Sequence, residues 1–316
     1  MGMTALRRMA LAALCTAPLA VGAATPLQSF AGRWDVTLKT PQRAYSSWLE
    51  IRAEHGQPRV RMVGRWGHAR WLPQASLSDG HLRFVSPKEE EGRTDGDMVF
   101  DGALDGGELR GTTTGPDGAT WTWRATRAPA LKAAYMPKWG TPVSLFDGRD
   151  ARAWTPVDTA AKQWRVADGV LTSPGAGTDL RSVASFGDFK LHLEFNCVPG
   201  ANSGVYLRGR YELQIENDRE PEAANMRTAG IYGYLAPSPA APRTPGVWQS
   251  YDITLVGRYV TVKLNGQTVI DRREIPGITG GALDSREGED GPLVLQGSED
   301  GQVSYRNIVI TPAVKP

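Results

Sequence analysis

The segment Phe189-Lys190-Leu191-His192-Leu193-Glu194-Phe195 places an apolar side chain at every odd position and a polar one at every even position. This period of two is typical of a β-strand that buries one face. The same alternation returns in Val205–Arg208 and in Tyr211–Glu216. Because no long stretch of the chain has the periodicity of a helix, we predict an all-β protein.

The composition supports many short strands joined by turns. The 316 residues include 36 glycines and 22 prolines, both of which favour turns. The chain has 36 basic and 34 acidic residues, and without a strongly basic field no nucleic-acid partner is expected. Two cysteines are too few for a disulfide framework or a Cys-rich zinc site.

Residues 1–24 have the pattern of a secretory signal peptide. Arg7 and Arg8 precede an apolar run from Met9 to Val21, and small residues follow at 22–24. The run is shorter than the ~20 residues of a membrane-spanning helix, so no membrane span is predicted. We expect a periplasmic or secreted protein. A lipid on Cys15 is the less favoured alternative, since Leu14 stands where a small residue would be needed.

Residues 26–130 are predicted to form a smaller antiparallel β-barrel or sandwich domain. Short strand-like segments recur, and the turn at residues 115–118 indicates a hairpin. The opening Gly32-Arg33-Trp34 and the closing Arg124 loosely resemble a lipocalin-type barrel. We interpret the six tryptophans of this domain as core residues, with a sugar-stacking surface as the alternative. They are Trp34, Trp48, Trp66, Trp71, Trp121 and Trp123.

Residues 131–142 are a short linker, and residues 143–314 are predicted to form a second domain. Strand patterns recur there, and Asn265-Gly266 marks a tight hairpin. This spacing predicts a two-sheet sandwich. The acidic run from Asp284 to Asp290 lacks calcium-loop spacing and is interpreted as a solvated loop.

Strand alternation also selects candidate functional side chains, because successive residues point to opposite faces. It predicts one outer surface shared by three segments, unless this is an ordinary solvated sheet face. Asn202-Ser203-Gly204 and Gly209 flank the central segment, where a glycine allows close approach of a ligand to the backbone. The side chains predicted to share the surface are Lys190, His192, Glu194, Tyr206, Arg208, Glu212, Gln214 and Glu216.

A series of short motifs in the second domain, taken together, resembles a known family. They include Leu145-Phe146-Asp147-Gly148, Asn202-Ser203-Gly204-Val205-Tyr206-Leu207-Arg208, Tyr211-Glu212-Leu213-Gln214-Ile215, Trp248-Gln249-Ser250-Tyr251 and Leu295-Gln296-Gly297. In this order they resemble the 3-keto-disaccharide hydrolase family, which implies a concanavalin-like jelly-roll fold. The chain departs from the family at Asn217, where an aspartate is common, and at Ser298, where a histidine is common.

The resemblance implies cleavage of 3-keto-glycosides. A C3 ketone acidifies the C2 proton, a base removes it, the C1 oxygen is expelled and water adds back. Such chemistry needs a base and a donor for the enolate oxygen. We therefore predict Glu194 and Glu212 as base and acid, with Arg208 as stabiliser. The predicted substrate-binding residues are Asn202, Tyr206, Gln214, His192 and Gln296.

Other functions remain open on the sequence alone. A non-catalytic carbohydrate-binding module could use the same fold, and a conventional two-carboxylate glycosidase could use a similar pair of acids. An interaction module carried by the N-terminal barrel is a third possibility. No His-x-x-x-His or clustered Cys/His pattern is present, so no metal or other cofactor is predicted. The expected partner is a small glycoside or an oligosaccharide.

Overall fold

The computed structural model describes residues 26–65, 67–88, 96–131, 136–216, 223–240, 244–298 and 300–314. The predicted signal peptide at 1–24, Trp66 and Asn217 lie outside these residues. Within them the prediction of an all-β protein is confirmed, since the helical segments are only α1 (Pro26–Phe30) and the 3-10 turn η1 (Ala224–Met226). No helix in these described ranges is long and apolar enough to cross a membrane.

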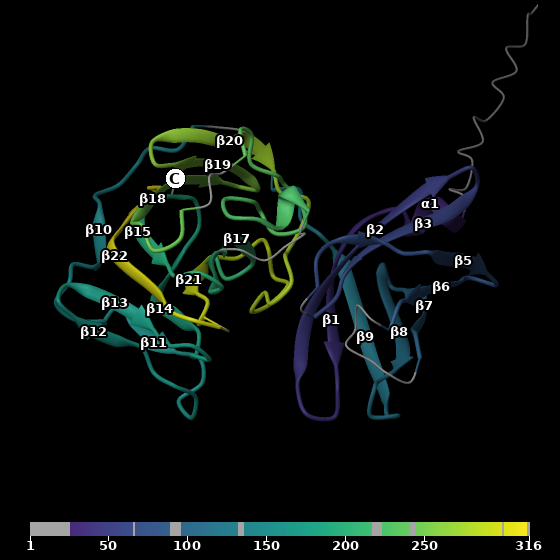
Figure 1. The fold of residues 1–316 in the computed structure, drawn as a ribbon. Helices are drawn as coiled ribbons and strands as arrows, with labels where there is room; N and C mark the ends of the chain where they lie inside the picture. The colour runs from purple at the N-terminus through teal and green to yellow at the C-terminus, as the bar shows by residue number, and fades with distance from the viewer. Residues whose placement is uncertain are drawn as a thin grey trace, which may run out of the picture.

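The N-terminal part is one curled antiparallel sheet of nine strands (Figure 1). Its order is β4-β3-β2-β1-β9-β8-β7-β6-β5, and β3 and β5 approach each other as the sheet curls. The strands are β1 (Gly32–Lys39), β2 (Ala44–Glu54), β3 (Gln57–Val63), β4 (Arg70–Trp71), β5 (Gln74–Ser78), β6 (His81–Ser86), β7 (Met98–Asp105), β8 (Glu108–Thr114) and β9 (Thr120–Arg127).

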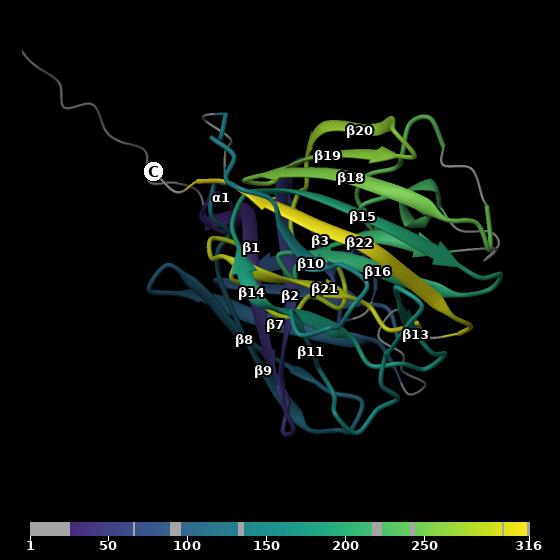
Figure 2. The ribbon, with the colours of Figure 1, turned by 90° about the vertical axis from the view of Figure 1, so that its left-hand side faces the viewer.

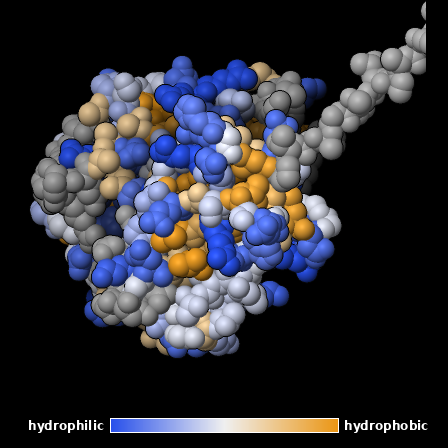
Figure 3. Space-filling view, turned by 90° about the vertical axis from the view of Figure 1, so that its right-hand side faces the viewer, coloured by the Kyte–Doolittle hydropathy of each residue, from blue (hydrophilic) through white to orange (hydrophobic). Residues whose placement is uncertain are grey.

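Aromatic side chains fill the inside of the curled sheet. The rings of Phe84 and Phe100 stack 4.9 Å apart, and Trp123 packs against both. Trp34 is buried beside Phe30. From the side of this sheet (Figure 3), apolar side chains gather in the middle of the face and hydrophilic ones surround them. The interpretation of these tryptophans as core residues therefore holds for Trp34, Trp121 and Trp123.

One detail of the barrel resemblance is wrong. The resemblance named Arg124 as the closing arginine that goes with the opening Trp34, but the guanidinium over the Trp34 ring, 3.8 Å from its centroid, belongs to Arg127. The reason is strand register, since β1 and β9 pair Trp34 with Arg127 and Thr37 with Arg124. Arg124 instead forms an ion pair with Glu108 on the neighbouring strand.

The C-terminal part is a sandwich of two antiparallel sheets, in agreement with the jelly-roll prediction. The eight-stranded sheet has the order β12-β13-β22-β15-β18-β19-β20, with β10 also paired to β22. The five-stranded sheet has the order β11-β14-β21-β16-β17. The strands are β10 (Val143–Phe146), β11 (Trp154–Pro156), β12 (Arg165–Ala167), β13 (Val170–Ser173), β14 (Leu180–Phe186), β15 (Phe189–Cys197), β16 (Asn202–Leu207), β17 (Tyr211–Glu216), β18 (Gln249–Val256), β19 (Tyr259–Leu264), β20 (Gln267–Glu274), β21 (Gly291–Leu295) and β22 (Val303–Pro312).

The core of the sandwich lies between its two sheets. The odd positions of β15 and β17, such as Leu193 and Leu213, are fully buried there, as the alternation predicted. Figure 2 looks onto the outer face of the eight-stranded sheet, with β18, β15 and β22 across its middle. Cys197 is buried at the end of β15, where its thiol donates to the carbonyl oxygen of Ala201 at 3.4 Å.

One large side chain lies at the centre of the packing between the two parts. Trp48 on β2 is fully buried in the same apolar cluster as the sandwich core. Its ring meets Tyr234 edge-on at 5.8 Å, and a Cβ at Gly277 would lie 2.2 Å from its Nε1. Trp48 is thus a core residue of the interface rather than of the N-terminal sheet.

Candidate functional site

The outer face of β16 and β17 carries a set of polar side chains that lie directly opposite one another. Register pairs Asn202 with Glu216, Gly204 with Gln214, and Tyr206 with Glu212. The alternate residues of both strands point into the sandwich core. We call Asn202, Tyr206, Glu212, Gln214 and Glu216 the polar row. The sequence prediction that β16 and β17 share an outward face is therefore correct for these residues.

The polar row is covered rather than solvated, because Glu212 is only 4% exposed. Loop segments run along the free edge of β17. The backbone N–H of Tyr232 donates to the carbonyl oxygen of Glu212 at 3.0 Å, and the N–H of Glu212 donates to Oγ1 of Thr279 at 3.0 Å. A polar group buried in this way must be held by partners, since an unpaired one is costly.

Tyr206 fixes the position of the Glu212 carboxylate. Its hydroxyl lies 3.0 Å from Oε2 of Glu212 and 3.0 Å from the carbonyl oxygen of Gly280. Burial, followed by the nearby charge of Glu212, raises the pKa of the Tyr206 hydroxyl well above its ordinary value. Tyr206 therefore stays a neutral hydrogen-bond donor at ordinary pH.

The absence of a side chain at Gly204 gives the Glu212 carboxylate its space. A Cβ at this position would lie 2.6 Å from Oε1 of Glu212. The carboxylate therefore lies across the neighbouring strand β16, above the gap that the glycine leaves. The sequence suggested close approach of another group at Gly204, and in the structure that group is the Glu212 carboxylate.

Gln214 and Gln296 both adjoin Gly204, the residue beneath the Glu212 carboxylate. Oε1 of Gln214 accepts from the N–H of Ile215 at 3.0 Å, so this amide is turned toward its own strand. The backbone N–H of Gln296 donates to the carbonyl oxygen of Gly204 at 2.9 Å, which places Gln296 at the end of β21 beside β16. Oε1 of Gln296 is buried and has no hydrogen-bond partner in the structure. Gln296 can therefore accept from a ligand hydroxyl.

The wall around the polar row includes backbone from the N-terminal part. The N–H of Gly281 donates to the carbonyl oxygen of Arg65 at 2.9 Å. Gly281 itself borders the Tyr206 hydroxyl, because a Cβ there would lie 2.4 Å from that oxygen. The connection between β3 and β4 thus touches the loop that holds Tyr206.

The prediction that Glu194 and His192 share a surface with Glu212 is wrong. After Cys197 the chain turns at Gly200 and crosses to the other sheet, so β15 and β16 belong to different sheets. Alternation identified the outward side of each strand correctly, but the outward faces of the two sheets point in opposite directions. Local periodicity cannot distinguish a hairpin from a crossover between sheets.

Glu194 has structural partners on its own sheet. Its Oε2 accepts from Nε of Arg306 at 2.7 Å, and its Oε1 accepts from Nδ2 of Asn307 at 2.6 Å. The bond from Asn307, followed by the bond and charge of Arg306, lowers the pKa of Glu194. His192 pairs with Asp252 through Nδ1 at 2.7 Å. Neither residue reaches the polar row.

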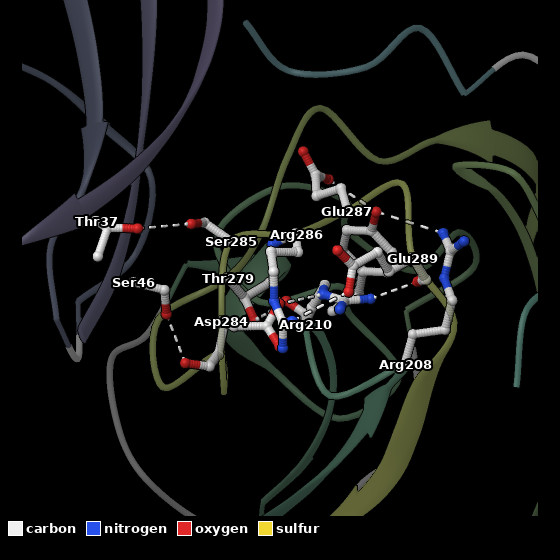
Figure 4. Close-up of polar contacts among 12 residues, drawn as sticks. Thr37, Ser46, Arg208, Arg210, Thr279, Asp284, Ser285, Arg286, Glu287 and Glu289 are labelled. Carbon is white, nitrogen blue, oxygen red and sulfur yellow. Dashed lines mark hydrogen bonds and ion pairs between the residues drawn. The ribbon is translucent and has the colours of Figure 1, made fainter. Parts of the chain in front are cut away.

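Arg208 also lies away from the polar row, against the prediction. It has a φ of 54°, so the alternation of β16 ends one residue before it. Its side chain is buried over the ring of Tyr211, 5.3 Å from the centroid, and donates to the carbonyl oxygen of Gly257. Figure 4 shows it on the far side of Glu287 and Glu289 from Thr37 and Ser46 of the N-terminal sheet. Arg208 is therefore not placed to stabilise an enolate beside Glu212.

The acidic run 284–290 is the expected solvated loop only in part, because Arg286 and residues 288–290 are exposed while Ser285 and Glu287 are buried. Figure 4 shows Thr37 of the N-terminal sheet bonded to Ser285 in this run. Ser46 of the same sheet donates to the carbonyl oxygen of Ala282, just before the run. Glu287 is fully buried and accepts from both Arg258 and Tyr211. The density of charged residues alone suggested that the run is exposed to solvent, but buried arginines neutralise the acidic side chains that are buried. We call residues 279–289 the interdomain strap.

Some residues around the polar row carried no sequence signal. Asp179 accepts from the N–H of Gly297 at 2.8 Å, and its charge contributes to the raised pKa of Tyr206. Thr279 belongs to no recognisable motif. Both lie in loops, and only the folded chain brings them to β16 and β17. Ser298, one of the two departures from the family pattern, is fully buried and donates to the carbonyl oxygen of Asp300 at 2.6 Å.

The described ranges contain no group of three or more His, Cys, Asp or Glu side chains that could hold a metal ion.

Comparison with known proteins identifies similar domains. The sequence profile of the 3-keto-alpha-glucoside-1,2-lyase-like domain matches residues 141–311, which is more than half of the chain. No curated protein sequence gives a significant match. A candidate glycosyl hydrolase from Parabacteroides distasonis ATCC 8503 is 32% identical, with a TM-score of 0.47, and the match covers 54% of this chain and 82% of that one. A second from the same organism is 24% identical, with a TM-score of 0.43 and coverage of 54% and 98%. The carbohydrate-binding module CBM66 from Bacillus subtilis is 15% identical, with a TM-score of 0.33 and coverage of 49% and 93%.

Proposed function

Because the chain belongs to the 3-keto-alpha-glucoside-1,2-lyase-like family of carbohydrate-active proteins, we propose that it cleaves 3-keto-glycosides with Glu212 as the base. The observation that carries this proposal is the Glu212 carboxylate, held by Tyr206 at 3.0 Å in a covered polar row. A positioned carboxylate of this kind is what proton abstraction requires.

The reaction has two stages. Glu212 takes the proton from C2, the electron pair forms a C1=C2 double bond, and the C1–O bond breaks. The leaving oxygen receives a proton, which completes the elimination. Water then adds its oxygen to C1 and a proton to C2, so that the net change is hydrolysis. Glu212 exchanges the proton that it took with solvent and then protonates C2, which restores the carboxylate for the next turnover.

The remaining groups of the row have positioning roles in this proposal. The neutral Tyr206 hydroxyl holds the carboxylate in one orientation. The amides of Asn202, Gln214 and Gln296 bind sugar hydroxyls and the C3 oxygen, since an amide offers both donors and an acceptor. Arg208, which the family resemblance suggested as the stabiliser, has no direct role because it lies near the interdomain strap.

A conventional two-carboxylate glycosidase is less well supported. Such enzymes place their carboxyl groups about 5–9.5 Å apart across the scissile bond. Glu194 and Glu212 point outward from opposite sheets, which themselves pack about 10 Å apart. Glu216 shares a face with Glu212, but it lies four positions further along the strand, which separates the Cα atoms by roughly 13 Å. The proposed reaction uses one carboxylate, so it does not require a second carboxylate at that distance.

The experiment is incubation with 3-keto-disaccharides and with their unoxidised parents in heavy water. We expect cleavage of the ketones only, and deuterium at C2 of the released 3-keto sugar. Cleavage of the parents at a similar rate would contradict the elimination mechanism. Sugar binding without any cleavage would instead favour the binding-module alternative.

We also propose that the protein acts outside the cytoplasm, on the basis of the predicted signal peptide at 1–24. Mass spectrometry of the protein purified from cells should find a mature N-terminus near Thr25. A full-length chain that remains in the cytosol would contradict export.

A further inference from the structure

Two adjoining cavities lie on the outer face of the eight-stranded sheet, the face seen in Figure 2. The larger has a volume of about 380 Å³ and is lined by Lys190, His192, Asp252 and Lys263, among others. The smaller has a volume of about 160 Å³. Since Thr254 and Thr261 line both, the cavities form one continuous depression. We call it the outer groove.

One wall of the outer groove does not come from the sheet itself. The segment from Met136 to Gly140 runs beside the end of β22, where Trp139 forms a β-bridge with Ala313. Met136 and Trp139 from this segment, together with Tyr259, line the smaller cavity. Met136 is 76% exposed, which is unusual for a large apolar side chain. A solvated sheet face would not need this added apolar wall.

The lining combines aromatic rings with hydrogen-bonding groups of several kinds. Trp139 and Tyr259 are both partly exposed, and a pyranose ring can pack its C–H face on such rings. The Lys190 ammonium lies 4.8 Å from the Trp139 centroid, so it links the aromatic end to the polar end. Asp252 holds the His192 ring at 2.7 Å. These groups offer both donors and acceptors, which a sugar hydroxyl needs.

The charges of the groove favour an uncharged ligand. Lys190, Lys263 and Arg272 carry positive charge, while Asp252 and Asp271 carry negative charge. Charges of both signs alternate along the groove, so no field of one sign attracts a polyanion. Small-molecule sites typically combine apolar and aromatic lining with a few placed polar groups, as this groove does.

We propose that the outer groove binds a chain of neutral sugars, at a second site separate from the polar row. The groove lies on the eight-stranded sheet and the polar row on the five-stranded sheet, so the two sites face opposite directions. A glycan held in the groove would keep the protein on a polymer without occupying the polar row. In this proposal His192 binds the glycan, although it does not reach the polar row.

Native gel electrophoresis in gels that contain a soluble polysaccharide tests this site. The probes are hydroxyethylcellulose, amylopectin, arabinoxylan and galactomannan, with alginate as an acidic comparison. The wild-type protein is expected to migrate more slowly with at least one neutral polysaccharide. Trp139→Ala and Tyr259→Ala should each weaken that retention at least about tenfold, the scale of an aromatic anchor in a binding site.

Trp248→Ala is the matched control, because Arg306 covers its ring at 4.1 Å and it does not line the groove. This variant should be retained like the wild type. Thermal melting of all three variants establishes that they are folded. If Trp139→Ala does not fold, Tyr259→Ala alone decides the result. The proposal is overturned if no neutral polysaccharide retards the wild type, if alginate alone does, or if the groove variants are retained as strongly as Trp248→Ala. None of these readouts depends on turnover of a 3-keto-glycoside.

Discussion

The hydroxyl of Tyr206 lies 3.0 Å from Oε2 of Glu212, and the same hydroxyl lies 3.0 Å from the carbonyl oxygen of Gly280. One side chain thus joins the proposed base on β17 to the interdomain strap beside it. The strap in turn bonds to Thr37 and Ser46 of the N-terminal sheet. The position of the proposed base therefore depends on contacts with both parts of the chain.

Tyr206→Phe should lower the turnover of a 3-keto-glycoside at least about tenfold, because the carboxylate loses the donor that orients it. The loss of a buried hydrogen bond costs about 1 kcal/mol, so the protein should stay folded. Steady-state kinetics and thermal melting measure the two effects. Tyr305→Phe is the control, since its hydroxyl bonds to Ser203 on the core side of the same sheet. Equal turnover in both variants would contradict the positioning role.

Gly204→Ala should reduce turnover by at least about tenfold while leaving most of the fold intact. The new Cβ would lie 2.6 Å from Oε1 of Glu212, so the carboxylate must move away from its place over β16. Gly96→Ala is a suitable comparison, because a Cβ there meets no atom within 4 Å. Kinetics of both variants check the prediction. Full activity in Gly204→Ala would show that the observed carboxylate position is not needed.

Asp35 should make the stability of the protein depend on pH. Burial, followed by the charge of Glu287, raises the pKa of the Asp35 carboxyl to about 9, against the opposing charges of Arg258 and Arg210. The folded protein then holds a proton that the unfolded chain releases above pH 3.8. This contribution to stability is therefore complete below about pH 4 and is lost as the pH rises toward 9.

Asp35→Asn should remove that part of the pH dependence, because an amide donates to Glu287 at every pH. The melting temperature of the variant, measured from pH 5 to 9, should fall less steeply than that of the wild type. Asp101→Asn is the control, since its bond from His81 lowers the pKa of Asp101 and places its titration at acidic pH. Identical slopes for Asp35→Asn and wild type would contradict the protonated state of Asp35.

Trp48→Ala should destabilise the protein by about 3–5 kcal/mol, the usual cost of a large cavity in a core. Trp48 is fully buried between the N-terminal sheet and the sandwich. Trp71→Ala offers a surface comparison, because Trp71 is partly exposed beneath Arg52 and Arg59. Chemical denaturation of the two variants measures the difference. Similar small losses would mean that the two parts are not joined by a common core.

Much of the fold could be predicted from the sequence, because it rests on local patterns. The odd positions of β15 and β17 are buried, and the Asn265-Gly266 turn joins β19 and β20. The relative placement of strands could not be predicted in the same way. Whether residues 198–201 form a hairpin or a crossover depends on contacts far along the chain. They form a crossover, and for this reason the prediction that Glu194 shares a surface with Glu212 was wrong.

The candidate site was predicted in part for the same reason. Tyr206, Glu212 and Gln214 share a face because they lie on adjacent paired strands. Arg208 leaves that face through a positive φ, which few non-glycine residues adopt and which no simple pattern announces. The burial of Glu287 depends on Arg258, 29 residues before it along the chain, so the acidic run gave no sign of its role in the interface.

The comparison of Glu212→Gln with Glu194→Gln tests the central claim most directly. Both changes remove one carboxylate charge from a strand of the same sandwich, on opposite sheets. With a 3-keto-disaccharide as substrate, Glu212→Gln should lower kcat at least about a hundredfold, the scale of a general base. Glu194→Gln, which loses only its contacts with Arg306 and Asn307, should stay within about threefold of the wild type. Equal losses in the two variants, or a larger loss in Glu194→Gln, would contradict the assignment of Glu212 as the base.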